Sequence, residues 1–101
     1  MQYRLLSALF AGCLLAGCGS YDEISPEAYQ YSKALYSICN RSDQARLDDF
    51  AVRLAAAEEN HELTSTEFRW INDIVATAQA GEWPAATKEA RRLMEDQIRR
   101  P

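Results

Sequence analysis

The chain has 101 residues, of which 15 are acidic and 11 are basic, and its net charge is −4. This length allows one small domain and no more. The acidic balance, without any basic stripe, argues against nucleic acid as a partner and against adsorption to anionic lipid.

The first part of the chain has the order of a secretory signal peptide. Arg4 supplies a cationic start, and an apolar run from Leu5 to Leu15 follows it. Small residues then precede a candidate cleavage point. The run is shorter than the roughly 20 residues that a membrane-spanning helix needs. A buried N-terminal helix is the alternative, but it would show polar residues at helical spacing, and this run has almost none.

The run ends in Leu15-Ala16-Gly17-Cys18. This tetrapeptide resembles the lipobox of bacterial lipoproteins, which is an aliphatic residue, two small residues and a cysteine. The resemblance implies cleavage between Gly17 and Cys18, a diacylglyceryl group on the Cys18 sulfur and a further acyl chain, such as palmitate, on the freed amine. Cys13 is a rival acceptor, but an aromatic residue, Phe10, stands where the pattern has an aliphatic one.

The resemblance also predicts a location outside the cytoplasm, with the membrane as the first partner. Residues 1–17 are removed, residues 18–24 form the lipidated cysteine and a short tether, and residues 25–101 form the folded domain. Because the tether spans at most about 25 Å when extended, the domain lies close to the membrane. In enteric-type lipoproteins, Asp after the lipidated cysteine retains the protein at the inner membrane. Gly19 therefore favours the periplasmic face of the outer membrane if the source is Gram-negative.

The first two helices are predicted from capping residues and apolar spacing. Ser25 and Pro26 start a helix that runs to about residue 39 or 40. A second helix covers about Asp43 to Glu59, with Asp49 and Arg53 spaced for a weak ion pair. Asn60 is predicted to end it in the left-handed conformation.

Two more helices follow. Thr64 and Glu67 form a capping box, and the third helix stops at Gly81. Trp83 and Pro84 start the fourth helix. The turn from Gly81 to Pro84 is short, which predicts that the third and fourth helices form an antiparallel helical hairpin. Two i, i+4 ion pairs are expected near its end, Glu95 with Arg99 and Asp96 with Arg100. The fold class is therefore all-α, a small bundle of three to four amphipathic helices that ends in this hairpin.

Four aromatic residues are candidate partner contacts, because aromatic residues are favoured at binding hot spots. They are Tyr29, Tyr36, Trp70 and Trp83. The same residue types also pack small cores. Cys39 is the thiol that remains after cleavage and lipidation, so it is either buried or bridges two copies.

No motif predicts catalysis, a metal or a cofactor. His61-Glu62-Leu63-Thr64-Ser65 begins like a zinc-protease motif but lacks the second histidine. Glu58 and Glu59 with His61 and Glu62 could hold a divalent ion weakly, although a solvated helix end explains them better. We therefore expect no enzyme activity, metal or cofactor.

The sequence favours a small membrane-anchored envelope lipoprotein that acts as a non-enzymatic helical interaction module near the membrane surface, with an envelope protein as its partner. The alternative is a self-associating structural or stress-type envelope lipoprotein with Cys39 as a candidate bridge. A weaker third hypothesis is a catalytic or ligand-carrying domain that uses the acidic end near His61.

Overall fold

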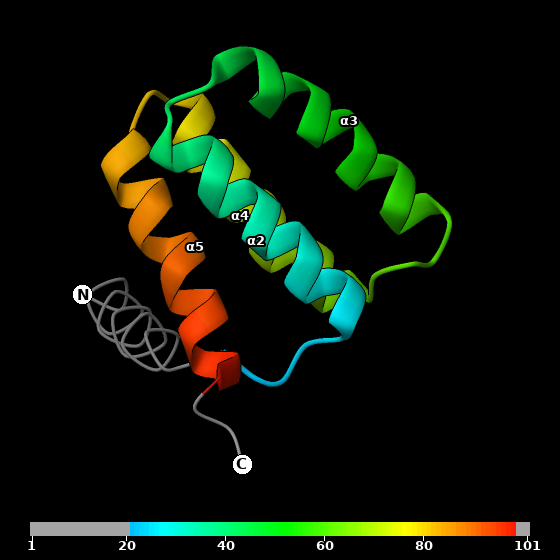
Figure 1. Cartoon of the computed structure of the whole chain (residues 1–101). Coiled ribbons are helices and arrows are strands. Elements are labelled where there is room, and N and C mark those ends of the chain that lie inside the picture. The colour runs from blue at the N-terminus through cyan, green and yellow to red at the C-terminus, as the bar shows by residue number, and fades with distance from the viewer. Residues whose placement is uncertain (1–20, 99–101) are drawn as a thin grey trace, which may run out of the picture.

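The computed structural model describes residues 21–98 and folds them into four helices (Figure 1). With the labels of Figure 1, they are α2 (Pro26–Asn40), α3 (Gln44–Glu59), α4 (Ser65–Gln79) and α5 (Trp83–Ile98). No strand occurs among these residues. The prediction of an all-α bundle is confirmed.

The helices α2 and α4 form the centre of the bundle, with their N-termini side by side. Figure 1 shows α3 on one side of this pair and α5 on the other. Within the described helices, α3 and α5 do not contact each other, whereas α2 packs most extensively against α5. Successive helices run in opposite directions, and α4 and α5 form the predicted antiparallel hairpin.

The helix starts agree with the predicted caps. The side chain of Ser25 accepts a hydrogen bond from the N–H of Ala28, and Pro26 is the first residue of α2. Asp43 caps α3. Thr64 and Glu67 form the complete capping box of α4. Each cap satisfies an N–H group that has no partner within its helix.

Three helix ends share one backbone pattern. The residue after each cap has a positive φ, 51° at Ser42, 60° at His61 and 85° at Gly81. After α4, the N–H of Gly81 bonds to the carbonyl of Ala78, and the N–H of Glu82 bonds to the carbonyl of Thr77. This is the Schellman motif, and equivalent bonds close α2 and α3.

The predicted end of α3 at Glu59 is confirmed, but the left-handed residue lies one position later than predicted. Asn60 keeps a negative φ of −87°, and its N–H bonds to the carbonyl of Ala56. His61 takes the left-handed position instead. With the chain reversing direction at His61, Leu63 lies buried in the core at 5% exposure. Burial of this leucine outweighs the local preference of asparagine for the left-handed conformation.

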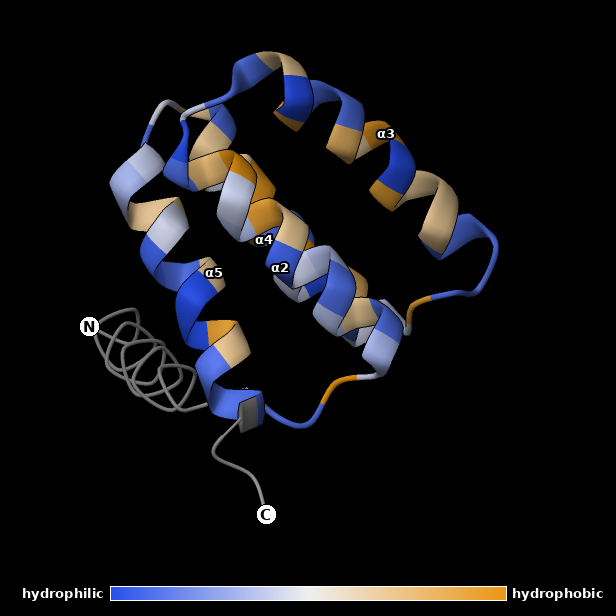
Figure 2. Ribbon diagram, in the orientation of Figure 1, coloured by the Kyte–Doolittle hydropathy of each residue, from blue (hydrophilic) through white to orange (hydrophobic). Residues whose placement is uncertain are grey.

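The core follows the apolar spacing of the helices. Figure 2 shows apolar positions recurring along α3, and the buried ones are Leu47, Phe50, Leu54 and Ala57. Two positions on α2 differ. Ala34, which is four residues before Ile38, is exposed, while Ser32 is buried and donates its hydroxyl hydrogen to the carbonyl of Ala28 at 2.9 Å. The side chains that are shielded most completely include Leu35, Leu47, Leu54, Ile71, Val75 and Leu93.

The segment before α2 differs from the predicted tether. The N–H of Tyr21 donates to Asp96 Oδ2 at 2.9 Å, and its hydroxyl donates to Glu89 Oε2 at 2.6 Å. Its ring meets the ring of Trp70 edge to face, with centroids 5.1 Å apart. The N–H of Ile24 bonds to Gln97 Oε1 at 3.0 Å. Residues 21–24 are therefore part of the folded bundle, because acceptors on α5 hold this segment in place.

Several predictions concern residues outside the described range. They are the signal peptide 1–17, the cleavage site at Gly17 and Cys18, and the ion-pair partners Arg99 and Arg100. None of the helices formed by residues 21–98 combines the length and apolar character that spanning a bilayer requires.

Candidate functional site

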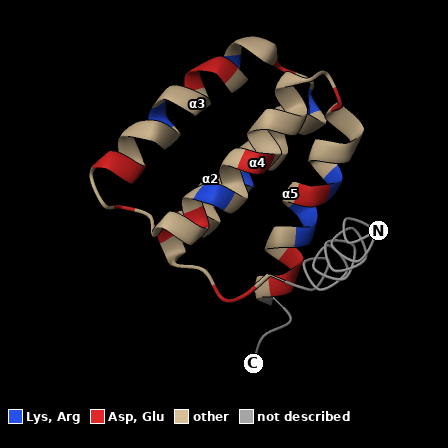
Figure 3. Ribbon diagram, turned by 180° about the vertical axis from the view of Figure 1, so that it is seen from behind, with Lys and Arg blue, Asp and Glu red and all other residues tan. Residues whose placement is uncertain are grey.

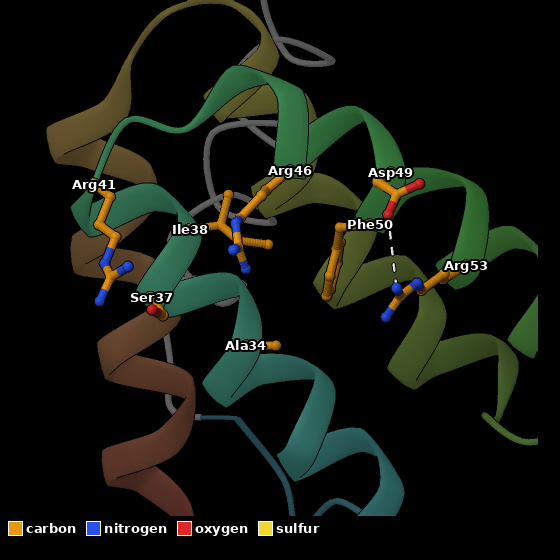
Figure 4. A pocket seen from close by; sticks show the side chains of 8 residues that line it. All are labelled: Ala34, Ser37, Ile38, Arg41, Arg46, Asp49, Phe50 and Arg53. Atoms are coloured by element: carbon orange, nitrogen blue, oxygen red, sulfur yellow. Dashed lines mark ion pairs between the residues drawn. The ribbon is translucent and has the colours of Figure 1, made fainter.

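A groove between α2 and α3 combines an apolar floor with a basic rim (Figure 4). Its volume is about 260 Å³. The residues that line it are Ala34, Ser37, Ile38, Arg41, Arg46, Asp49, Phe50 and Arg53. We call it the α2–α3 groove.

Helical periodicity places these residues on two facing stripes. On α2, Ala34 and Ile38 are four residues apart, and Arg41 follows at the cap. On α3, Arg46 and Arg53 are seven residues apart, with Phe50 between them. Residues at these spacings share one helix face. The antiparallel packing of α3 on α2 turns the two stripes toward each other.

The floor of the groove is fixed by packing. Phe50 is 6% exposed, and its ring meets the ring of Tyr31 edge to face with centroids 5.9 Å apart. Ile38 is half-buried and packs against the core. Because the core and Tyr31 fix the positions of Phe50 and Ile38, an apolar side chain can cover them without rearrangement of the core.

The rim carries three guanidinium groups and one carboxylate in a chain that is acidic as a whole. Arg53 lies 3.6 Å from Asp49, which confirms the predicted ion pair, and Arg46 lies 3.4 Å from Asp43. Both arginine side chains are 74% exposed. Such exposed pairs contribute at most about 1 kcal/mol each, so an incoming carboxylate can replace either acid. Among the described residues, no ion pair engages Arg41.

A second hollow lies between the end of α2 and the start of α5. Its volume is about 470 Å³, and Trp83 and Pro84 form one wall opposite Asn40 and Ser42. The hydroxyl of Thr87 donates to the Trp83 carbonyl at 2.8 Å, which fixes the first turn of α5. Lys88 and Arg91 complete its basic edge.

The four aromatic candidates come from three helices, with Tyr29 and Tyr36 on α2, Trp70 on α4 and Trp83 at the start of α5. Tyr36, Trp70 and Trp83 are half-buried and pack against the core. The hydroxyl of Tyr36 accepts a hydrogen bond from Arg91 at 2.8 Å, and Trp70 contacts Tyr21. Tyr29 is half-buried on α2. Three of the four therefore serve contacts within the domain, and Trp83 also lines the hollow between α2 and α5.

Cys39 is buried at 1% exposure. Burial raises the pKa of its thiol to about 11, so the thiol stays protonated at neutral pH. Because the thiolate is the reactive form, Cys39 is a weak nucleophile in the folded domain.

His61 lies exposed at the positive-φ position after α3. In residues 21–98, no group of three or more His, Cys, Asp or Glu side chains is arranged to hold a metal ion. The buried carboxylate of Glu67 has a structural role instead. Burial raises its pKa, but hydrogen bonds from Thr64 and Ser25 outweigh that effect and lower the pKa below its ordinary value of 4.5.

The α2–α3 groove was missed at the sequence level, where Asp49 and Arg53 were expected only as a surface pair. Arginines at the border of two apolar stripes were the available signal. Comparison with known proteins adds no relative, because no family model, no curated protein and no solved structure matches the chain.

Proposed function

We propose that this protein is a small lipoprotein of the bacterial cell envelope, anchored to the membrane through Cys18. Its helical domain binds a partner protein at the membrane surface and catalyses no reaction. The lipobox-like segment Leu15-Ala16-Gly17-Cys18 supports the anchor. The α2–α3 groove supports the binding role.

The lipobox-like segment is the observation that carries the proposal, and the attachment of Tyr21 to the bundle relates it to the fold. Only three peptide steps separate Cys18 from Tyr21, and they span at most about 11 Å when extended. Tyr21 in turn bonds to Asp96 and Glu89 and contacts Trp70. A lipid on Cys18 would thus hold the side of the bundle formed by α4 and α5 against the bilayer.

Acylation supplies enough energy for a stable anchor. Each buried methylene group contributes about 0.8 kcal/mol, and a single acyl chain binds only marginally. Two or three chains on Cys18 hold a protein durably without a spanning helix. Gly19, directly after the cysteine, favours the periplasmic face of the outer membrane in a Gram-negative source.

Self-association through a Cys39 disulfide is the alternative function. A disulfide between copies needs two sulfur atoms about 2 Å apart. Cys39 lies at the wall of the hollow between α2 and α5 and is 1% exposed, so the side chains around it would have to move before the sulfur could reach a second copy. This burial weighs against the alternative.

Metabolic labelling tests the anchor. The full chain is expressed in a bacterium that is fed an alkyne analogue of palmitate, and label is followed in the membrane fraction. The parent chain and Cys13→Ser are expected to carry label, whereas Cys18→Ser is expected to lose it. Label that persists in Cys18→Ser and disappears in Cys13→Ser would overturn the assignment of the anchor to Cys18.

A further inference from the structure

We infer that the α2–α3 groove binds an acidic amphipathic segment of a partner protein. Apolar side chains of that segment would cover Ile38 and Phe50, and its carboxylates would pair with Arg41, Arg46 and Arg53. This inference rests on the proposed binding function and names the chemical class of the partner.

The size of the groove favours side chains of a longer chain over a small molecule. Its volume of about 260 Å³ is below the range of about 300–1,000 Å³ that is usual for small-molecule pockets. The groove also runs between two antiparallel helices, so it has a direction along which a segment can lie. An amphipathic segment packed along such a groove is a common mode of peptide recognition.

Charge complementarity selects an acidic segment. Three arginines line the groove against Asp49 in the lining and Asp43 beside Arg46, so the groove keeps an excess of positive charge, although the chain carries a net charge of −4. Guanidinium groups bind carboxylates through two parallel hydrogen bonds, which fixes their geometry. An oppositely charged patch also steers the partner to the groove and disfavours basic competitors.

A second copy of this chain is a poorer occupant. Figure 3 shows acidic residues at the end of α3 and in the segment that leads into α2, away from the basic groove. They include Glu58, Glu59, Asp22 and Glu23. This acidic end presents no large exposed apolar side chain to cover Ile38 and Phe50, because Val52, the exposed large apolar residue of the described chain, lies in the middle of α3. The partner is therefore a different protein.

The position of the groove keeps it accessible at the membrane. Tyr21, near the proposed anchor, contacts α4 and α5. The groove lies along α3, which Figure 1 shows on the opposite side of the central pair from α5. The bilayer would therefore leave this groove open to a membrane-bound partner.

A binding assay tests the inference. The full chain in detergent is titrated into a fluorescein-labelled helical peptide of about 18 residues, with leucines on one face and glutamates beside them. A matched peptide carries lysine in place of every glutamate. The glutamate peptide is expected to bind by fluorescence polarisation, and the lysine peptide is not. Failure of the glutamate peptide to bind, or equal binding of both, would overturn the inference.

Two triple variants locate the site. Arg41→Glu/Arg46→Glu/Arg53→Glu removes the basic rim, and Lys33→Glu/Arg69→Glu/Lys88→Glu makes the same change in net charge at exposed positions outside the groove. We expect the first variant to weaken binding roughly tenfold or more and the second to change it by less than about twofold. Equal weakening would show a nonspecific charge effect and contradict the groove.

Photo-crosslinking covers the case in which a triple variant unfolds. A benzophenone amino acid replaces Ser37 in the groove or, as a control, exposed Asn72 on α4. The glutamate peptide is expected to crosslink from position 37 and not from position 72. Crosslinks between copies of the chain from position 37 would instead identify a self-association surface and contradict a different partner.

The assay separates the two proposals, because Cys18→Ser removes the anchor and leaves the groove intact. Binding of the glutamate peptide by an unlipidated chain would support the groove while the anchor fails. A lipidated chain that binds both peptides equally would support the anchor while the groove fails.

Discussion

The carboxylate of Glu67 joins two helices by accepting the N–H of Ser25 at 2.8 Å. The same carboxylate accepts the N–H of Thr64 at 3.0 Å within its own capping box. The hydroxyl of Ser25 donates to it as well, at 3.3 Å. One buried charge therefore satisfies backbone groups at the starts of both α2 and α4 and fixes the two central helices relative to each other.

Replacement of Glu67 by glutamine is expected to destabilise the domain by about 1–3 kcal/mol at neutral pH, because hydrogen bonds to a charged acceptor are lost. Urea unfolding followed by circular dichroism measures this change. Glu62→Gln, at an exposed position, is the matched control and is expected to have little effect.

The pH dependence of the stability of the parent chain and of Glu67→Gln tests whether the charge of Glu67 causes the difference between them. The pKa of Glu67 is lowered in the folded state, so its contribution is fully present above the ordinary value of 4.5. It is lost as the pH falls through the lower folded pKa. The stability difference between the parent chain and Glu67→Gln should therefore shrink as the pH falls below about 4.5. A difference that stays constant to pH 2 would contradict the charged hydrogen bonds as its source.

Tyr21 is expected to hold the N-terminal segment on the bundle. Tyr21→Ala removes the edge-to-face contact with Trp70 and the hydrogen bond to Glu89, and should cost about 1–3 kcal/mol. Tyr21→Phe keeps the ring and should cost less. Hydrogen exchange of the residue 21–24 amides is the direct measurement, and fast exchange of these amides in the parent chain would contradict the attachment.

The three positive-φ residues predict opposite effects of glycine and alanine. Ser42→Gly and His61→Gly should each stabilise the domain by up to about 1 kcal/mol, because a side chain in the left-handed region is strained. Gly81→Ala should destabilise it by about 1 kcal/mol. A Cβ at Gly81 meets nothing within 4 Å, so this cost is purely conformational. Thermal unfolding measures all three, and a stabilising Gly81→Ala would contradict the assignment.

Local features of the fold were predictable from the sequence. Ser25 capped α2 as expected, and Thr64 with Glu67 formed their capping box, because these contacts join residues three apart. Contacts between distant residues were not predictable. The bonds from Tyr21 to Asp96 and from Ile24 to Gln97 connect residues 75 and 73 apart, and no local pattern specifies them.

The α2–α3 groove also depends on contacts between distant residues, which the sequence does not specify. The helical spacing of Arg46, Phe50 and Arg53 was visible, but that spacing does not say which helix faces it. The packing of α3 on α2 supplies Ile38 and Arg41 from the other side. Trp83 was predicted as a partner contact from residue type alone, and residue type does not distinguish an interface from a core.

Cys39 is expected to be unreactive in the folded chain. In a Cys13→Ser/Cys18→Ser background it is the remaining thiol. With its pKa raised to about 11, about one thiol in a thousand is ionised at pH 8, so reaction with Ellman's reagent should be slow until urea unfolds the domain. Fast reaction without urea, or a dimer on a non-reducing gel that Cys39→Ser abolishes, would contradict the burial and favour self-association.

Mass spectrometry of the protein isolated from its native membrane tests the central claim most directly. We predict an N-terminal peptide that begins at Cys18 and carries a diacylglyceryl group on the sulfur, with a further acyl chain on the amine. A chain that begins at Met1 and has an unmodified thiol at Cys18 would contradict the anchor and the position of the bundle at the membrane.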